Sequence, residues 1–157
     1  MNTHQTARSV MQKDVITVSP ETSLGDLQRL FVEESIGGCP VVDDRNIVVG
    51  VVSSTDLLRA VNDERDTAVA ETRYYRDDFA FSSPDWSDIE DFQDRLAELQ
   101  VSDAMTAGSL FVDVDAPIPD VARTFRQHRV HRVLVVEGDA LAGIISTLDL
   151  VGLLEGK

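Results

Sequence analysis

The hydrophobic pattern of residues 1–61 predicts a strand, a helix, two strands and a second helix, in that order. A β-rich run at residues 15–18 precedes apolar positions that share one helical face, namely Leu24, Leu27, Leu30 and Phe31. Two apolar runs, 40–42 and 47–52, predict strands joined by a short polar turn. The closing helix is expected to open with Ser53 to Asp56, because Ser and Asp commonly cap helix N-termini.

The same succession of patterns returns in residues 101–157. A run at 110–112 predicts the first strand, and the helical face consists of Ile118, Val121, Ala122 and Phe125. Runs at 133–136 and 141–145 predict the paired strands, and Ser146 to Asp149 opens the last helix. Identical residues stand at equivalent places: Met11 and Met105, Phe31 and Phe125, Gly50 and Gly143, Asp56 and Asp149. The order of these matches indicates an internal repeat, whose members we call copy one and copy two.

The repeat predicts an α+β fold built from two βαββα units. A unit of about fifty residues buries only a modest core, so the two units are expected to pack through their sheets with pseudo-twofold symmetry. The same argument favours a homodimer. The predicted organisation is a first unit at 1–61, a helical connector at 62–100 and a second unit at 101–157.

The connector differs in composition from both copies. It is acidic and holds most of the aromatic residues, namely Tyr74, Tyr75, Phe79, Phe81, Trp86 and Phe92. A flexible linker would not be rich in aromatic residues, so we expect the connector to pack. The closing helix of copy one is expected to continue past Val61 along the stripe Ala68, Thr72 and Tyr75.

A second amphipathic helix is expected later in the connector, from Ile89, Phe92, Leu96 and Leu99. Ser87 and Glu90 have the spacing of a capping box at its start. The connector could cover the surface of its own module or a dimer seam, or it could be a docking surface for an effector protein. Both possibilities stay open at this point.

Composition limits the classes of partner. The formal net charge is −14, from 28 acidic and 14 basic residues, which disfavours nucleic acids and anionic membranes as partners. Such a balance can equally reflect the source organism. No apolar run approaches the about 20 residues of a membrane-spanning helix, and the N-terminus lacks the apolar core of a signal peptide. Cys39 is the single cysteine, so an internal disulfide is excluded, and a cytoplasmic location is expected.

The motifs of both copies resemble the CBS domain, which occurs in tandem as a Bateman module. The resemblance rests on the segments at residues 10–20, 39–43 and 50–58 of copy one and at residues 104–106, 130–136 and 143–150 of copy two. It covers residues 7–61 and 101–154. The resemblance implies a cleft between the paired units that holds AMP, ADP, ATP or S-adenosylmethionine. It also implies a regulatory module that signals to a partner protein, without catalytic activity and without a required cofactor.

The junctions Ser53–x–x–Asp56 and Ser146–x–x–Asp149 are the first candidate sites. A helix N-terminus offers unpaired N–H groups and a positive dipole end that suit a phosphate, and a serine hydroxyl could add a donor. The carboxylates could accept hydrogen bonds from the diol of a ribose. Thr55 and Thr147 lie within these junctions and are further candidates. The simpler interpretation is helix capping alone.

A cationic pair, His131 and Arg132, precedes a predicted strand of copy two. The pair resembles the phosphate-contacting residues of energy-sensing CBS modules, and an arginine can bind a phosphate through two hydrogen bonds. The alternative is a solvated edge that pairs with carboxylates of this acidic chain. Gly37 and Gly38 occupy the equivalent positions of copy one and offer no cation, so we expect two unequal sites, of which one is empty or selects a less phosphorylated ligand.

Adenine requires an apolar slot. The candidate residues are Val15, Ile16, Cys39 and Pro40 in copy one and Leu110 and Val133 in copy two. Ordinary core packing is an equally good interpretation of these positions. No base that could activate the Cys39 thiol is evident beside it, so this residue is interpreted as a small apolar filler.

Two other classes of function compete with nucleotide sensing. A structural dimerisation or adaptor module would have vestigial clefts, which the glycines of copy one favour. An enzyme is disfavoured, because His4, His128 and His131 are the only histidines and form no metal-ligand or nucleophile–base pattern.

Overall fold

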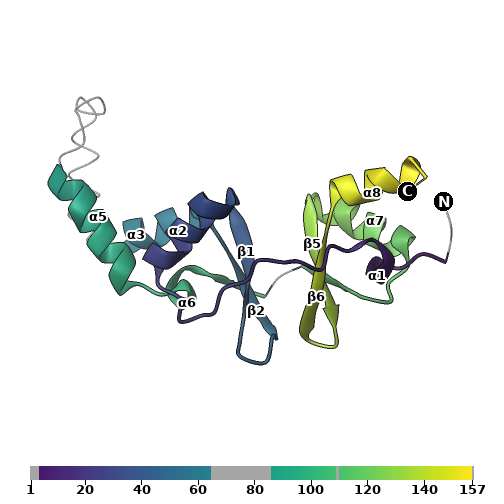
Figure 1. Ribbon diagram of the computed structural model, residues 1–157, viewed down its shortest axis with the longest axis horizontal. Coiled ribbons are helices and arrows are strands. Elements are labelled where there is room, and N and C mark those ends of the chain that lie inside the picture. Colours follow the sequence, from purple (N-terminus) through teal and green to yellow (C-terminus); the bar gives the residue numbers. More distant parts are fainter. Residues whose placement is uncertain (1–3, 65–85, 109, 157) are drawn as a thin grey trace. The chain divides into compact units, whose positions relative to one another are not determined.

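The computed structural model describes residues 4–64, 86–108 and 110–156. Its elements are α1 (Ala7–Val10), α2 (Leu24–Glu34), β1 (Gly38–Val42), β2 (Val48–Ser53), α3 (Ser54–Glu64), α5 (Trp86–Glu98), α6 (Val101–Ala104), β3 (Thr106–Ala107), β4 (Phe111–Asp113), α7 (Ile118–His128), β5 (Arg132–Glu137), β6 (Ala140–Ser146) and α8 (Thr147–Leu154) (Figure 1). The strands form two three-stranded sheets, in the orders β1-β2-β3 and β4-β5-β6. The predicted α+β class is confirmed, and each copy contains the expected succession of a helix, two strands and a closing helix.

The chain divides into two compact units that do not follow the order of the sequence. The first consists of Met1–Thr17, Pro40–Val51 and Ala107–Lys157, and we call it the Asp149 unit. The second consists of Val18–Cys39 and Val52–Thr106, and we call it the Asp56 unit. The first residues of each copy, 1–17 and 101–106, therefore belong to the unit that contains the other copy's closing helix.

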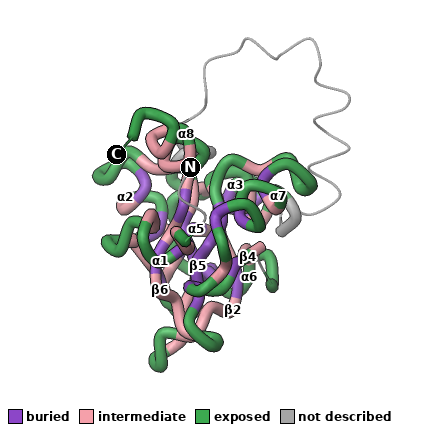
Figure 2. Tube along the Cα trace, turned by 90° about the vertical axis from the view of Figure 1, so that its right-hand side faces the viewer, coloured by how far each residue is buried: buried purple, intermediate pink, exposed green. Residues whose placement is uncertain are grey.

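The core of the Asp149 unit lies between its sheet and α7. Strand β5 runs parallel to β4 and antiparallel to β6. The apolar face of α7 is buried, and four successive residues of β5 are buried because both faces of the strand are covered (Figure 2). The register of the antiparallel pair places Arg132 opposite Ser146. The beginning of β5 therefore lies beside the end of β6, where α8 starts.

The N-terminal segment is part of this core. Ala7 is fully buried, and its N–H donates to the carbonyl of Ala116 at 2.9 Å. Gln12 exchanges two backbone hydrogen bonds with Ile144, at 2.8 and 3.0 Å. A β-carbon on Gly143 would lie 2.7 Å from the carbonyl oxygen of Gln12, so this close approach of the two backbones requires glycine.

The Asp56 unit packs α2 against α3 and the connector helix α5. The hydroxyl of Ser23 caps α2 by accepting from the N–H of Asp26 at 3.1 Å. Leu24, Leu27 and Leu96 are buried together with little or no exposed surface. Helix α6 is held on this unit, because the Val101 N–H donates to Thr22 at 2.7 Å.

Some local expectations from the sequence are wrong. Residues 15–18 form no strand; only Val18 takes part in a β-bridge, and the N–H of Val15 is used in a local turn to the carbonyl of Lys13. The capping box expected at Ser87 and Glu90 is also wrong, since α5 already includes both residues from its start at Trp86.

Part of the connector lies outside the described residues. Helix α3 ends at Glu64, so the predicted stripe at Ala68, Thr72 and Tyr75 is not described, and neither are Tyr74, Phe79 and Phe81. The predicted second helix is present as α5. Its contact with α2 is close: a β-carbon on Gly25 would lie 3.9 Å from the backbone of Leu96 and Ala97.

Candidate functional site

At the Asp149 junction, β6 ends at Ser146 and α8 begins with the next residue. The N–H and the hydroxyl of Ser146 both donate to Oδ2 of Asp149, at 2.8 and 3.0 Å. In return, the N–H of Asp149 donates to the Ser146 hydroxyl at 3.3 Å. This reciprocal capping box fixes the carboxylate at the start of the helix.

The Asp56 junction has the same geometry. The N–H and hydroxyl of Ser53 donate to Oδ2 of Asp56, both at 2.9 Å, and the Asp56 N–H donates to the Ser53 hydroxyl at 3.2 Å. In both junctions, one carboxylate oxygen is committed to the cap. Oδ1 remains the oxygen that a ligand could approach.

The caps change the predicted role of the two serines. A hydroxyl has one proton to donate, and Ser53 and Ser146 each give that proton to a carboxylate. Neither hydroxyl can donate to a phosphate without breaking its cap. The serines therefore position the aspartates, and a phosphate would have to use backbone N–H groups instead.

One backbone donor of each first turn is left for such a ligand. The N–H of Ser54 donates to the carbonyl of Gly37 at 3.0 Å, and that of Thr147 to the carbonyl of His131 at 2.9 Å. The next N–H along, from Thr55 or Leu148, has no hydrogen-bond partner within the part of the chain that the structure describes. Thr55 thus offers its backbone N–H at this junction. Thr147 also donates its hydroxyl to His131, at 3.2 Å, and so fixes the start of β5.

The two junctions differ in what faces Oδ1. In the Asp149 unit, the side-chain amide of Gln12 donates to Oδ1 of Asp149 at 3.0 Å. In the Asp56 unit, Oδ1 of Asp56 lies 3.7 Å from the guanidinium of Arg59. Sequence reasoning missed both residues. Arg59 could have been found from its i,i+3 spacing, whereas nothing in the sequence connects Gln12 with Asp149.

The cations of copy two lie where the sequence predicts them. His131 and Arg132 are exposed at the start of β5, and neither forms an ion pair with any described residue. The glycines of copy one hold the matching place beside Ser54. The expectation that copy one offers no cation holds for this strand start, but Arg59 supplies one from the adjoining helix.

The residues predicted to hold adenine are divided between the two units. Val15 and Ile16 were grouped with Asp56 on sequence grounds, but both belong to the Asp149 unit and are half-buried there. Leu110 packs against the core of that unit, and Val133 is fully enclosed in it. For the Val133 side chain, core packing is the interpretation that its burial favours.

Cys39 and Pro40 are buried at the start of β1. Burial raises the pKa of the Cys39 thiol to about 11. A thiol with this pKa holds its proton at neutral pH and is a poor nucleophile. Its predicted role as an apolar filler agrees with this environment.

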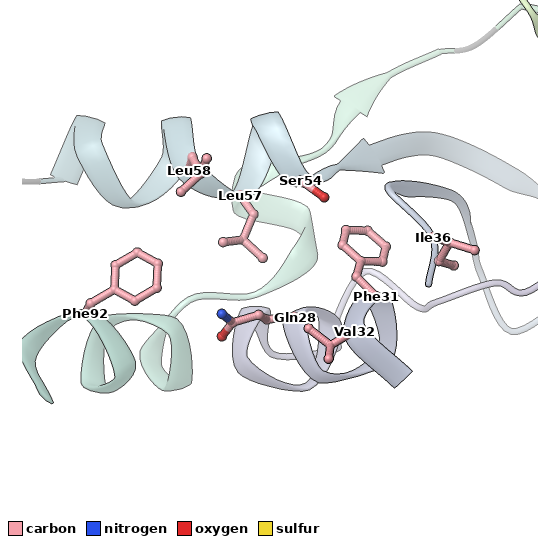
Figure 3. Close-up of a pocket in the computed structure, with 8 residues that line it drawn as sticks. All are labelled: Gln28, Phe31, Val32, Ile36, Ser54, Leu57, Leu58 and Phe92. Carbon is pink, nitrogen blue, oxygen red and sulfur yellow. The ribbon is translucent and has the colours of Figure 1, made fainter. Parts of the chain in front are cut away.

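A separate apolar cavity of about 300 Å³ opens among α2, α3 and α5 of the Asp56 unit (Figure 3). Phe31 and Val32 of α2 face Leu57 and Leu58 of α3, and Phe92 of α5 lies at one end. None of the predicted ligand residues lines this cavity. Ser54, the first residue of α3, also lines it, so the cavity borders the Asp56 junction from the helical side.

Comparison with known proteins decides the family. The CBS domain model matches residues 7–63 and 101–156. The chain belongs to the CBS domain family. Both matches include a Ser–x–x–Asp junction, so the capping geometry described above is that of two CBS domains.

Curated CBS relatives are longer than this chain. The CBS domain-containing protein CBSX2 of Arabidopsis thaliana chloroplasts is 30% identical over 144 residues, which are 89% of this chain and 58% of the relative. Inosine-5′-monophosphate dehydrogenase of Bifidobacterium longum is 29% identical over 92% of this chain and 21% of its own length. The chain thus spans less than two thirds of these relatives.

Solved CBS structures share the fold. CBSX2 in complex with AMP is 26% identical, with a TM-score of 0.67 and 97% of each chain covered. The CBS domain pair of protein MJ0100, in complex with 5′-methylthioadenosine and S-adenosyl-L-methionine, has a TM-score of 0.63 over 97% of each chain. Its identity of 18% shows the fold alone.

The described residues include neither a metal-binding cluster nor a membrane-spanning helix. No cluster of His, Cys, Asp and Glu that could hold a metal ion is present among them. Within the same part of the chain, every helix is too short or too polar to cross a bilayer.

Proposed function

We propose that this CBS domain chain is a regulatory module that binds an adenine nucleotide at its two Ser–x–x–Asp junctions and signals to a partner protein. One observation carries the proposal: each junction locks Oδ2 of its aspartate in a cap, and the same first helical turn holds a backbone N–H that has no partner among the described residues. An acceptor for ribose and a donor for phosphate thus belong to one helical turn. The likeness to CBSX2, which was solved with AMP, supports the choice of ligand class.

In this proposal, Asp56 and Asp149 accept hydrogen bonds from the ribose diol. Ser53 and Ser146 hold those carboxylates in place. At the Asp149 junction, His131 and Arg132 lie at the strand start and are available to contact phosphate. Among the residues predicted to hold adenine, the half-buried Val15, Ile16 and Leu110 remain candidates at the Asp149 junction, whereas Val133, Cys39 and Pro40 support the site from the core.

The finer parts of the proposal concern ligand, assembly and location. The candidate ligands are AMP, ADP, ATP and S-adenosylmethionine, with no required cofactor, no catalytic step, and neither nucleic acid nor membrane as partner. A homodimer is supported by apolar side chains that α8 leaves exposed, namely Leu148, Val151 and Leu154. The effector is a protein, and the cytoplasm is the proposed location.

A thermal-shift panel tests the ligand class. AMP, ADP, ATP, S-adenosylmethionine and, as an outlier, NAD are each added at millimolar concentration, and the melting temperature is measured. A ligand that binds only the folded chain raises this temperature by mass action. A rise with at least one adenosine compound is expected, and no rise with any of them would refute the proposal.

A second candidate function is a structural adaptor with vestigial sites. The observation that favours it is the internal occupation of Oδ1 by Gln12 in one unit and Arg59 in the other. Binding of the effector protein with equal affinity in the presence and absence of nucleotide would identify this function. A nucleotide-dependent change in that affinity would exclude it.

A further inference from the structure

We propose that Arg59 is the phosphate-binding cation of the Asp56 junction and makes this site selective for phosphorylated ligands. The inference rests on the proposed function and deepens it. It reverses the expectation from the sequence that the glycines of copy one leave this site empty or suited to a less phosphorylated ligand.

The first step is that Gly37 and His131 hold the same position in their units. The N–H of Ser54 donates to Gly37 at 3.0 Å, and its hydroxyl lies 3.4 Å from the same carbonyl. Thr147 makes the matching pair of contacts to His131, at 2.9 and 3.2 Å. The strand start of the Asp56 unit therefore presents no side chain where the Asp149 unit presents a histidine and then an arginine.

The second step is that the helices show the opposite difference. Arg59 lies one turn beyond Asp56, with its guanidinium 3.7 Å from Oδ1. The equivalent residue of α8, three after Asp149, is Gly152, and a β-carbon built there meets no atom within 4 Å. Each junction thus has a cationic source, on the strand in one unit and on the helix in the other.

The third step concerns the freedom of Arg59 to change partner. Its side chain is 66% exposed and that of Asp56 only 12%, and the 3.7 Å separation is longer than a hydrogen bond. An ion pair at this separation, with its guanidinium mostly in solvent, is weak. The guanidinium can leave the carboxylate at little cost.

A nucleotide would provide a hydrogen-bonding partner for Asp56 and for Arg59 at the same time. Its ribose hydroxyl would donate to Oδ1 of Asp56, and its phosphate would accept charge-assisted hydrogen bonds from Arg59. A nucleoside offers no acceptor for the guanidinium and would only compete with it for Oδ1. Arg59 therefore favours AMP over adenosine at this junction.

The test isolates one site by calorimetric titration of the full chain with the Asp149→Asn substitution. Asparagine retains an oxygen for the cap but replaces the ligand-facing oxygen with an amide. AMP and adenosine are titrated into this protein with and without Arg59→Gln. We expect Arg59→Gln to weaken the affinity for AMP by about tenfold or more, because a charge-assisted hydrogen bond is lost. The affinity for adenosine should stay within about twofold.

Arg29 provides a matched control. Ser23, Asp26 and Arg29 repeat the Ser–x–x–Asp–x–x–Arg spacing at the start of α2, where the arginine lies 3.9 Å from the aspartate. Arg29→Gln removes the same charge at the same helical spacing and should leave both affinities unchanged. Arg59→Lys keeps the charge and should retain most of the AMP affinity.

The outcomes separate the two proposals. If the Asp149→Asn protein binds no AMP, the proposed function fails at this junction, and the role of Arg59 fails with it. If that protein binds AMP, two results would overturn the role of Arg59 alone. Either Arg59→Gln leaves the affinity for AMP unchanged, or it weakens the affinities for AMP and adenosine equally. Circular dichroism of each variant confirms that the fold is retained.

Discussion

The Asp56 and Asp149 junctions share one cap and differ in nearly everything around it. Both hold Oδ2 with two hydrogen bonds from the serine, and the aspartate N–H donates back to the serine hydroxyl, since a helix N-terminus has unpaired N–H groups that must be satisfied. What faces Oδ1 is an arginine in one unit and a glutamine amide in the other. Helix formation thus fixes the position of the aspartate, whereas the neighbouring side chains decide what a ligand would meet at Oδ1.

The origin of those neighbours also differs. Arg59 comes from the same helix as Asp56. Gln12 comes from the N-terminal segment, which the sequence assigns to copy one and which the structure places on β6 of copy two. A local pattern therefore sets one site, and a contact between distant parts of the chain sets the other.

The substitution with the largest expected effect disrupts the contact between the N-terminal segment and β6. The Gly143→Ala substitution would place a β-carbon 2.7 Å from Gln12 and push the N-terminal segment off β6. We expect a loss of about 1–3 kcal/mol in the free energy of unfolding, as for other overpacked sites, measured by urea denaturation. Gly152→Ala is the control, because its β-carbon meets open space in a helix and should stabilise by up to about 1 kcal/mol. Equal effects of the two substitutions would contradict this account of the contact.

A smaller effect is expected when the cation of the Asp56 junction is moved from the helix to the strand. In a chain with Asp149→Asn and Arg59→Gln, the further change Gly38→Arg should restore about tenfold in AMP affinity, since it copies Arg132 into the Asp56 unit. A β-carbon at Gly38 lies 3.3 Å from the carbonyl of Val52, so a shift of a few tenths of an ångström is required. Calorimetry reports the affinity. Failure to recover AMP binding in a folded variant would show that strand and helix cations are not interchangeable.

Removing the serine cap that both junctions share should lower the stability of both units alike. Ser53→Ala and Ser146→Ala each delete the hydroxyl that donates to the aspartate and accepts from its N–H. Loss of a cap costs about 1 kcal/mol, so both variants should lower the free energy of unfolding by similar amounts in chemical denaturation. A loss at one junction only would mean that the two caps are not equivalent.

The smallest effect is confined to alkaline pH. Cys39 of the Asp56 unit matches Val133 of the other copy, and burial raises its pKa from 9.0 to about 11. The unfolded thiol ionises first, so the contribution of Cys39 to stability is complete below about pH 9 and falls as the pH rises towards 11. Thermal melts across this range should show a steeper decline for the wild type than for Cys39→Ala. Parallel declines would exclude a buried, protonated thiol.

Sequence reasoning found the caps and most of the elements for a physical reason. Ser53, Asp56, Ser146 and Asp149 act through local hydrogen bonds at fixed spacing, which a sequence displays directly. Hydrophobic periodicity likewise located α5 in the connector.

The errors have equally physical causes. Residues 15–18 have strand-forming side chains, but the N–H of Val15 donates to the carbonyl of Lys13 in a local turn and not to a neighbouring strand. Gln12 reaches Asp149 only because the fold pairs two segments far apart in the chain, and no local pattern reports such a contact. Arg59 was visible in the sequence, but its importance depends on the missing side chains at Gly37 and Gly38.

Calorimetric titration of AMP into four proteins tests whether Asp56 and Asp149 each form an AMP site: the wild type, Asp56→Asn, Asp149→Asn and the double variant. We expect each single variant to lose one binding site and the double variant to lose both, while melting temperatures without ligand stay close to the wild-type value. Asp26→Asn, at the matching position of α2, should retain both sites. AMP binding by the double variant with the stoichiometry and affinity of the wild type would contradict the account.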